Sequence, residues 1–82
     1  MTDAIRELDT VVLKRDVPEA NLRAGDLGAV VHVHDREMIE VEFVTASGRT
    51  QALQMLSAAD VRAVRDDDLL AVRSAKSMRG AS

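Results

Sequence analysis

Two histidines and two glutamates are the side chains of this sequence best suited to metal binding or proton transfer. His32 and His34 are separated by one residue, and the same spacing recurs in the pair Glu40 and Glu42. On two paired β-strands these four side chains would share one face. Imidazole and carboxylate groups together can bind zinc or change charge near neutral pH. Because nothing nearby would orient such ligands, we expect a solvated, pH-responsive face and no metal site.

Side-chain catalysis is not expected elsewhere in the chain. There is no cysteine, and the candidate hydroxyl nucleophiles fall in turns or at strand edges: Thr10, Ser47, Thr50 and Ser57. Their spacing from the histidines gives no Ser–His–Asp arrangement. The acidic run at residues 66–68 is more typical of a solvated helix start than of a cation site. We therefore expect no catalytic residue, no cofactor and no enzymatic activity.

The segment LRAGDLGAVVHVHD, residues 22–35, has the two closely spaced glycines that phosphate-binding loops use. Such loops open onto a helix N-terminus and often carry a lysine. Here the glycines open onto a β-branched run, and an aspartate stands where an anion would bind. We expect Gly25-Asp26 to form a turn and Gly28 to permit close approach of a neighbouring backbone.

The same segment also resembles the KOW-type motif of SH3-like barrels in ribosomal and transcription-factor proteins. The residues that carry this likeness are Leu22, Gly25, Asp26, Gly28, Val30 and Val33. Those modules add lysines and aromatic residues around the loop, whereas this loop has only Arg23. The net charge of the chain is −3, which opposes phosphate-backbone binding. RNA binding through residues 22–28 stays an alternative, and nucleic acid is not the expected partner.

Five short apolar runs separated by polar turns must position these residues. We expect strands at residues 9–13, 27–34, 38–45, 50–56 and 61–64, with a single helical turn at residues 57–60. Pro18 makes a helix through residues 14–26 unfavourable, so that stretch is a long loop, anchored by Val17 and Leu22. The pattern predicts an all-β fold, a small five-stranded SH3-like antiparallel barrel over residues 1–64.

Alternation within two of the strands predicts which side chains form the core. Ile39, Val41 and Phe43 share one face of residues 38–45 and should point inward. In residues 27–34, strict alternation places Val31 and Val33 on one face. The opposite face then carries Val30, His32 and His34.

Residues 65–82 form a C-terminal extension of different character. Three aspartates precede a weakly apolar stretch and basic residues follow it, which predicts a short helix, frayed unless it docks. Leu69, Leu70 and Val72 are the candidate partner-binding residues, together with Arg23 of the long loop. Two roles stay open for the leucines, contact with a partner or capping of the chain's own barrel.

The sequence contains no apolar run of the ~20 residues that a membrane span needs and no signal-peptide pattern at its start. We expect a cytoplasmic protein with no membrane contact. Only one residue is aromatic, and the apolar residues are mostly Ala, Val and Leu. A core of such small side chains favours support from a partner or a homo-oligomer.

Residues 5–64 are similar to the small bacterial proteins grouped as domain of unknown function 4926. The points of likeness are residues 8–13, 16–19, 25–28, 30–33, 40–43 and 53–62. The resemblance implies an SH3-like barrel, similar in outline to that of nitrile hydratase β-subunits, without known catalytic residues. It also implies a small accessory protein, antitoxin-like in its pairing with a protein encoded nearby. We expect a non-catalytic interaction module, with a structural subunit related to nitrile hydratase β-subunits as a further alternative.

Overall fold

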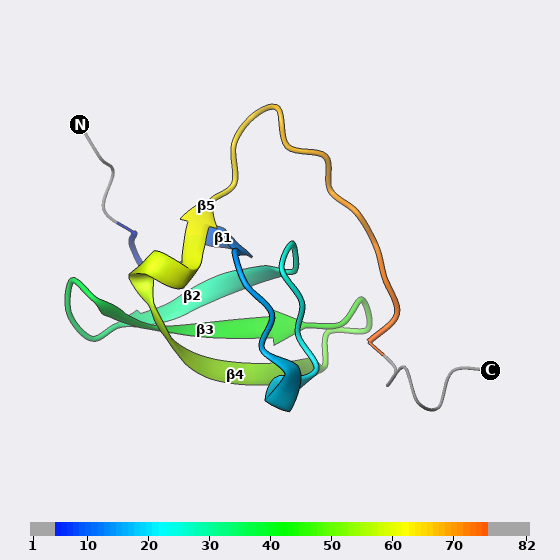
Figure 1. Ribbon diagram of the computed structural model, residues 1–82, viewed down its shortest axis with the longest axis horizontal. Coiled ribbons are helices and arrows are strands. Elements are labelled where there is room, and N and C mark those ends of the chain that lie inside the picture. The colour runs from blue at the N-terminus through cyan, green and yellow to red at the C-terminus, as the bar shows by residue number, and fades with distance from the viewer. Residues whose placement is uncertain (1–4, 76–82) are drawn as a thin grey trace.

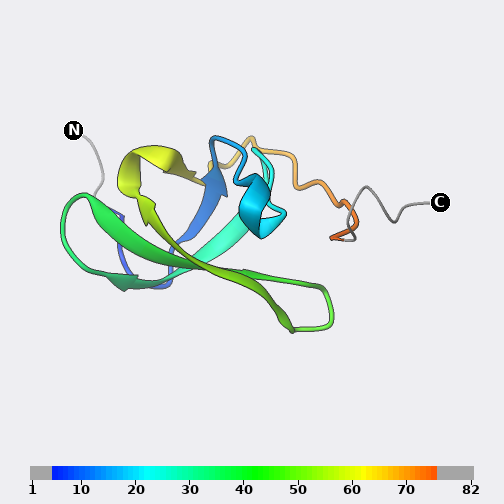
Figure 2. The same ribbon diagram turned by 60° about the horizontal axis from the view of Figure 1, so that its bottom comes forward.

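The computed structural model describes residues 5–75, in which five antiparallel strands form one sheet in the order β4-β3-β2-β1-β5 (Figure 1). The strands are β1 (Thr10–Leu13), β2 (Leu27–Val33), β3 (Met38–Val44), β4 (Thr50–Ser57) and β5 (Val61–Ala63), and 3₁₀ turns lie at Pro18–Ala20 and Ala58–Asp60. The predicted all-β, five-stranded antiparallel fold is confirmed. The sheet curls around its core (Figure 2) but β4 and β5 share no ladder, so the barrel is not closed.

The concave face of this sheet holds a core of Val, Leu and Ile side chains around one aromatic ring. Ile39, Val41 and Phe43 are at most 3% exposed, which confirms the inward face predicted for β3. Val17 and Leu22 pair across the long loop and are buried as well. These two apolar residues therefore hold the loop against the core, as predicted.

The predicted faces of β2 are wrong because a β-bulge interrupts its pairing with β3. Val30 lies opposite Val41 and is fully buried, whereas Val31 is 40% exposed. One extra residue between Val30 and His32 lets two successive side chains point outward. Past the bulge, Val33 lies opposite Ile39 and turns inward again.

Gly28 is required by a close approach, although not by the approach to a backbone that we expected. A Cβ at this position would lie 2.5 Å from Val41 Cγ1 and 2.9 Å from Phe43 Cε2. The core side chains themselves fill the space. Gly25 and Gly48 have φ of +98° and +89°, values that suit glycine in turns.

The C-terminal extension contains no helix within residues 65–75, contrary to the prediction; the remainder of the predicted helix lies outside the described residues. One turn precedes an extended stretch (yellow to orange in Figure 1) that runs down one side of the sheet. The physical reason is that Asp68 and Arg73 form ion pairs with Arg62 and Asp26, respectively. Among residues 5–75, no helix is long and apolar enough to cross a bilayer.

Candidate protein-interaction surface

Residues 69–72, Leu-Leu-Ala-Val, form a short apolar stretch held at both ends, called here the anchored span. The first anchor is an ion pair between Arg62 of β5 and Asp68. Arg62 Nη1 and Nη2 donate to the two carboxylate oxygens of Asp68, both at 2.9 Å. The N–H of Arg65 also donates to Asp68, at 2.6 Å. A bidentate guanidinium–carboxylate pair fixes direction as well as distance, so the span starts from a defined point.

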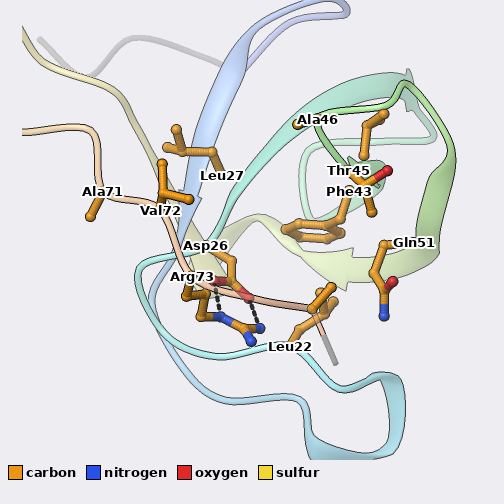
Figure 3. Close-up of a pocket in the computed structure, with 12 residues that line it drawn as sticks. Leu22, Asp26, Leu27, Phe43, Thr45, Ala46, Gln51, Ala71, Val72 and Arg73 are labelled. Carbon is orange, nitrogen blue, oxygen red and sulfur yellow. Dashed lines mark hydrogen bonds and ion pairs between the residues drawn. The ribbon is translucent and has the colours of Figure 1, made fainter. Parts of the chain in front are cut away.

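The second anchor joins Arg73 to Asp26, directly before β2. Arg73 Nη2 and Nε donate to the two carboxylate oxygens of Asp26 at 2.6 and 2.8 Å (Figure 3). Arg73 also donates to the carbonyl of Asn21, and the Asn21 amide donates to the carbonyl of Ala75. The side chains of Arg73 and Asp26 are 28% and 17% exposed, so this pair is better shielded from water than a typical surface ion pair.

The large side chains of the anchored span point to solvent. Leu69 is 95% exposed, Leu70 69% and Val72 98%. Of the two roles left open by the sequence, capping of the chain's own barrel is therefore not observed. The predicted contact residues instead stand on the surface, on a backbone fixed at both ends.

Arg23, the other predicted contact residue, lies close to the second anchor. Its N–H donates to the Asp26 carboxylate at 2.8 Å, and its side chain is not among the groups held by an ion pair in the described part of the chain. The loop and the end of the anchored span are thus both hydrogen-bonded to the carboxylate of Asp26.

A pocket of about 430 Å³ separates the anchored span from the β3–β4 turn. The Phe43 ring faces this space, with Leu22 and Leu27 beside it and Arg73 along one wall (Figure 3). Its walls are mostly apolar, and the tail closes one side. The surface near the span is consequently hollowed and hydrophobic.

The histidines and glutamates singled out in the sequence do share the outer face of the sheet. His34 Nε2 lies 3.4 Å from Glu40 Oε1, His32 Nδ1 lies 3.4 Å from Glu7 Oε2, and the two imidazole rings meet edge to face. Glu42 instead accepts a hydrogen bond from Thr50. In residues 5–75 no three His, Asp or Glu side chains converge as metal ligands would.

Sequence reasoning found the apolar residues of the span and missed both anchors. Asp26 and Arg73 are 47 positions apart, and nothing local links them. Asp68 and Arg62 are closer in sequence, but their pairing depends on a turn that the helix signals concealed.

The anchors make the attachment of the span dependent on pH. Hydrogen bonds from Arg62 and from the Arg65 N–H lower the pKa of Asp68 from 3.8 to about 2. Burial alone would raise the pKa of Asp26, but hydrogen bonds from Arg73 and the Arg23 N–H outweigh it and lower that pKa as well. Because both folded-state pKa values are depressed, the stabilisation is complete above the ordinary value near 3.8 and is lost as pH falls through the folded values.

We therefore expect the span to detach between about pH 4 and pH 2, with the amide NMR signals of residues 69–72 moving to disordered positions. Asp68→Asn should bring the same change in signals for Leu69 and Leu70 at neutral pH, since it removes one anchor. Asp67→Asn, a matched change of an exposed neighbour, should leave the signals in place. Equal effects of the two variants would contradict the role given to Asp68.

Comparison with known proteins gives a family and no close relative. Residues 7–63, more than half of the chain, match the family described as Domain of unknown function (DUF4926). Neither the curated proteins nor the solved structures contain a match. The matched range includes one residue of each ion pair, Asp26 and Arg62. It ends before their respective partners, Arg73 and Asp68.

Proposed function

The chain belongs to the family Domain of unknown function (DUF4926), and on that premise we propose that it is a non-catalytic interaction module that binds a second protein through the anchored span. The proposed partner is encoded by a neighbouring gene in a bacterial genome, in an antitoxin-like or accessory arrangement. The proposed place of binding is the cytoplasm.

The observation that supports this function is the exposure of three large apolar side chains on a backbone that is already fixed. Leu69, Leu70 and Val72 are each more than two-thirds exposed. Burying one such side chain fully against a partner stabilises a complex by about 1.5–3 kcal/mol. Because the Arg62–Asp68 and Arg73–Asp26 pairs hold the ends, less backbone entropy is lost on binding than for a tail held at one end only.

The extended form of the span also suits recognition. Extended segments are bound through main-chain hydrogen bonds, and pockets for their side chains supply specificity. Arg23 and the neighbouring pocket lie where a partner that covers the span would reach. A hydrophobic centre with a charged residue at its margin is a common composition for protein interfaces.

RNA binding through residues 22–28 has less support from the structure. The N–H groups of Arg23, Ala24 and Gly25 donate to Asp26, Asp16 and Leu13, respectively. These donors are therefore engaged within the protein, and two of the acceptors are carboxylates that repel phosphate. A structural subunit related to nitrile hydratase β-subunits stays a prediction.

Co-purification with the product of the neighbouring gene tests the proposed function. We expect the double variant Leu69→Ser/Leu70→Ser to lose the partner without loss of fold, because both side chains are exposed. Leu8→Ser, a matched change of an exposed leucine before β1, should retain it. Loss of the partner with Leu8→Ser alone, or retention by the double variant, would assign binding to another surface.

A further inference from the structure

The outer edge of β4 is a long strand edge without the usual protection against pairing. Its eight residues, TQALQMLS, include no charged residue and no proline, the two devices that most often block edge pairing. The opposite edge of the sheet, β5, is only three residues long and leads directly into the Arg62–Asp68 anchor. The two edges of the sheet are therefore unequal, and β4 is the one that can accept another strand.

The hydrogen-bond pattern shows which backbone groups of β4 are available. Met38 and Ser57 are opposite each other in the β3–β4 ladder, and the Ala58 N–H donates to the Glu37 carbonyl just beyond them. This bond marks Met38–Ser57 as a non-hydrogen-bonded pair. Because such pairs alternate along an antiparallel ladder, the N–H and C=O groups of Leu53 and Met55 point away from β3, toward the open edge.

The side chains at these positions are apolar and half exposed. Leu53 is 52% and Met55 50% exposed, although their neighbours across the ladder are Glu42 and Glu40. Apolar side chains beside available backbone donors and acceptors are the features of a strand that pairs with another.

We propose that two copies of this chain pair antiparallel through β4, with Leu53 of one copy opposite Met55 of the other. In this register Gln54 lies on the twofold axis, and the Leu53–Met55 pairing occurs twice, as an isologous contact requires. Opposite residues of antiparallel strands point to the same side, so the outer faces of both copies form one continuous surface. The open backbone groups of Leu53 and Met55 then satisfy each other.

Charges at the two ends of β4 favour a second copy over other strands. Antiparallel pairing brings Arg49, before one β4, beside residues 58–60 of the other copy and the adjoining Glu37. Arg49 and Glu37 are exposed, and neither belongs to an ion pair within the described part of the chain. The strand between them is uncharged, so the pairing has complementary ends and no repulsion at its centre. This surface is separate from the anchored span.

Sedimentation of the full chain over a concentration series tests the proposal. We expect a dimer that dissociates on dilution, and a monomer for Met55→Lys at every concentration. Met55→Pro should also be a folded monomer, because the N–H it removes faces the open edge, where proline is tolerated. Leu70→Lys, in the anchored span, should remain a dimer. This control separates failure of the dimer from failure of the partner surface.

Charge reversal tests the register. Arg49→Glu should weaken the dimer, and the double variant Arg49→Glu/Glu37→Arg should restore it, with circular dichroism unchanged throughout. A wild-type chain that sediments as a monomer at all concentrations would overturn the proposal. So would a dimer that persists in both Met55 variants, or one that Leu70→Lys dissociates.

Discussion

Phe43→Ala is expected to leave a large fraction of the protein unfolded at room temperature. The ring is 3% exposed and packs in the core with Val30 and Val41. Removal of a buried phenylalanine costs about 3–5 kcal/mol. The remaining core is made of smaller aliphatic side chains, and a domain of this size has only about 5 kcal/mol or somewhat more in total. Thermal unfolding followed by circular dichroism measures the loss directly.

Val44→Ala is the matched control for that prediction. Val44 is the next residue of β3 and is 47% exposed, so its truncation removes little buried surface. We expect its melting temperature to stay near that of the wild type. Similar melting temperatures for Phe43→Ala and the wild type would place the ring outside the core and refute the assigned faces of β3.

Gly28→Val should also destabilise the fold strongly, through overpacking rather than through a cavity. Even a single Cβ would meet Val41 Cγ1 at 2.5 Å and Phe43 Cε2 at 2.9 Å, and both atoms belong to buried side chains. Overpacking of a core typically costs about 1–3 kcal/mol, and valine adds two further methyl groups to a position already too close. Urea titration of Gly28→Ala and Gly28→Val should show losses that increase with side-chain size.

Gly48→Ala supplies the comparison for the glycine series. Gly48 has positive φ but open space around a Cβ, so its substitution should cost about 1–2 kcal/mol from backbone strain alone. Gly28→Val should exceed this loss. If the two variants were equally stable, the packing of Val41 and Phe43 against Gly28 would not be the reason for the glycine.

The sequence was sufficient to predict the faces of β3 because its inward residues are apolar and the residues between them, Glu40 and Glu42, are charged. Ile39, Val41 and Phe43 alternate with polar residues and face one core, so a period of two leaves no second solution. It was insufficient for β2, where Val30 and Val31 are equally apolar. Only pairing with β3 decides which residue the bulge turns outward. Because the neighbouring residues are both valines, their sequence does not indicate the bulge.

The extension shows how tertiary contacts override local signals. The three aspartates at 66–68 and the basic residues after the apolar stretch are placed as the start and end of a helix would place them, so the sequence predicts a helix. In the folded chain Asp68 and Arg73 instead form ion pairs with Arg62, six positions away, and with Asp26, 47 positions away. The apolar residues between them could be identified from the sequence, but their presentation could not.

Site-specific photo-cross-linking tests most directly whether the anchored span is the surface for a partner protein. A benzophenone amino acid at position 70, in the full chain expressed in its native cell, should form an adduct with a second, different protein. Asp68→Asn and Arg73→Gln, which release the two ends of the span, should abolish that adduct together. Absence of any adduct with another protein, or an adduct that persists after both anchors are removed, would contradict binding through a fixed apolar span.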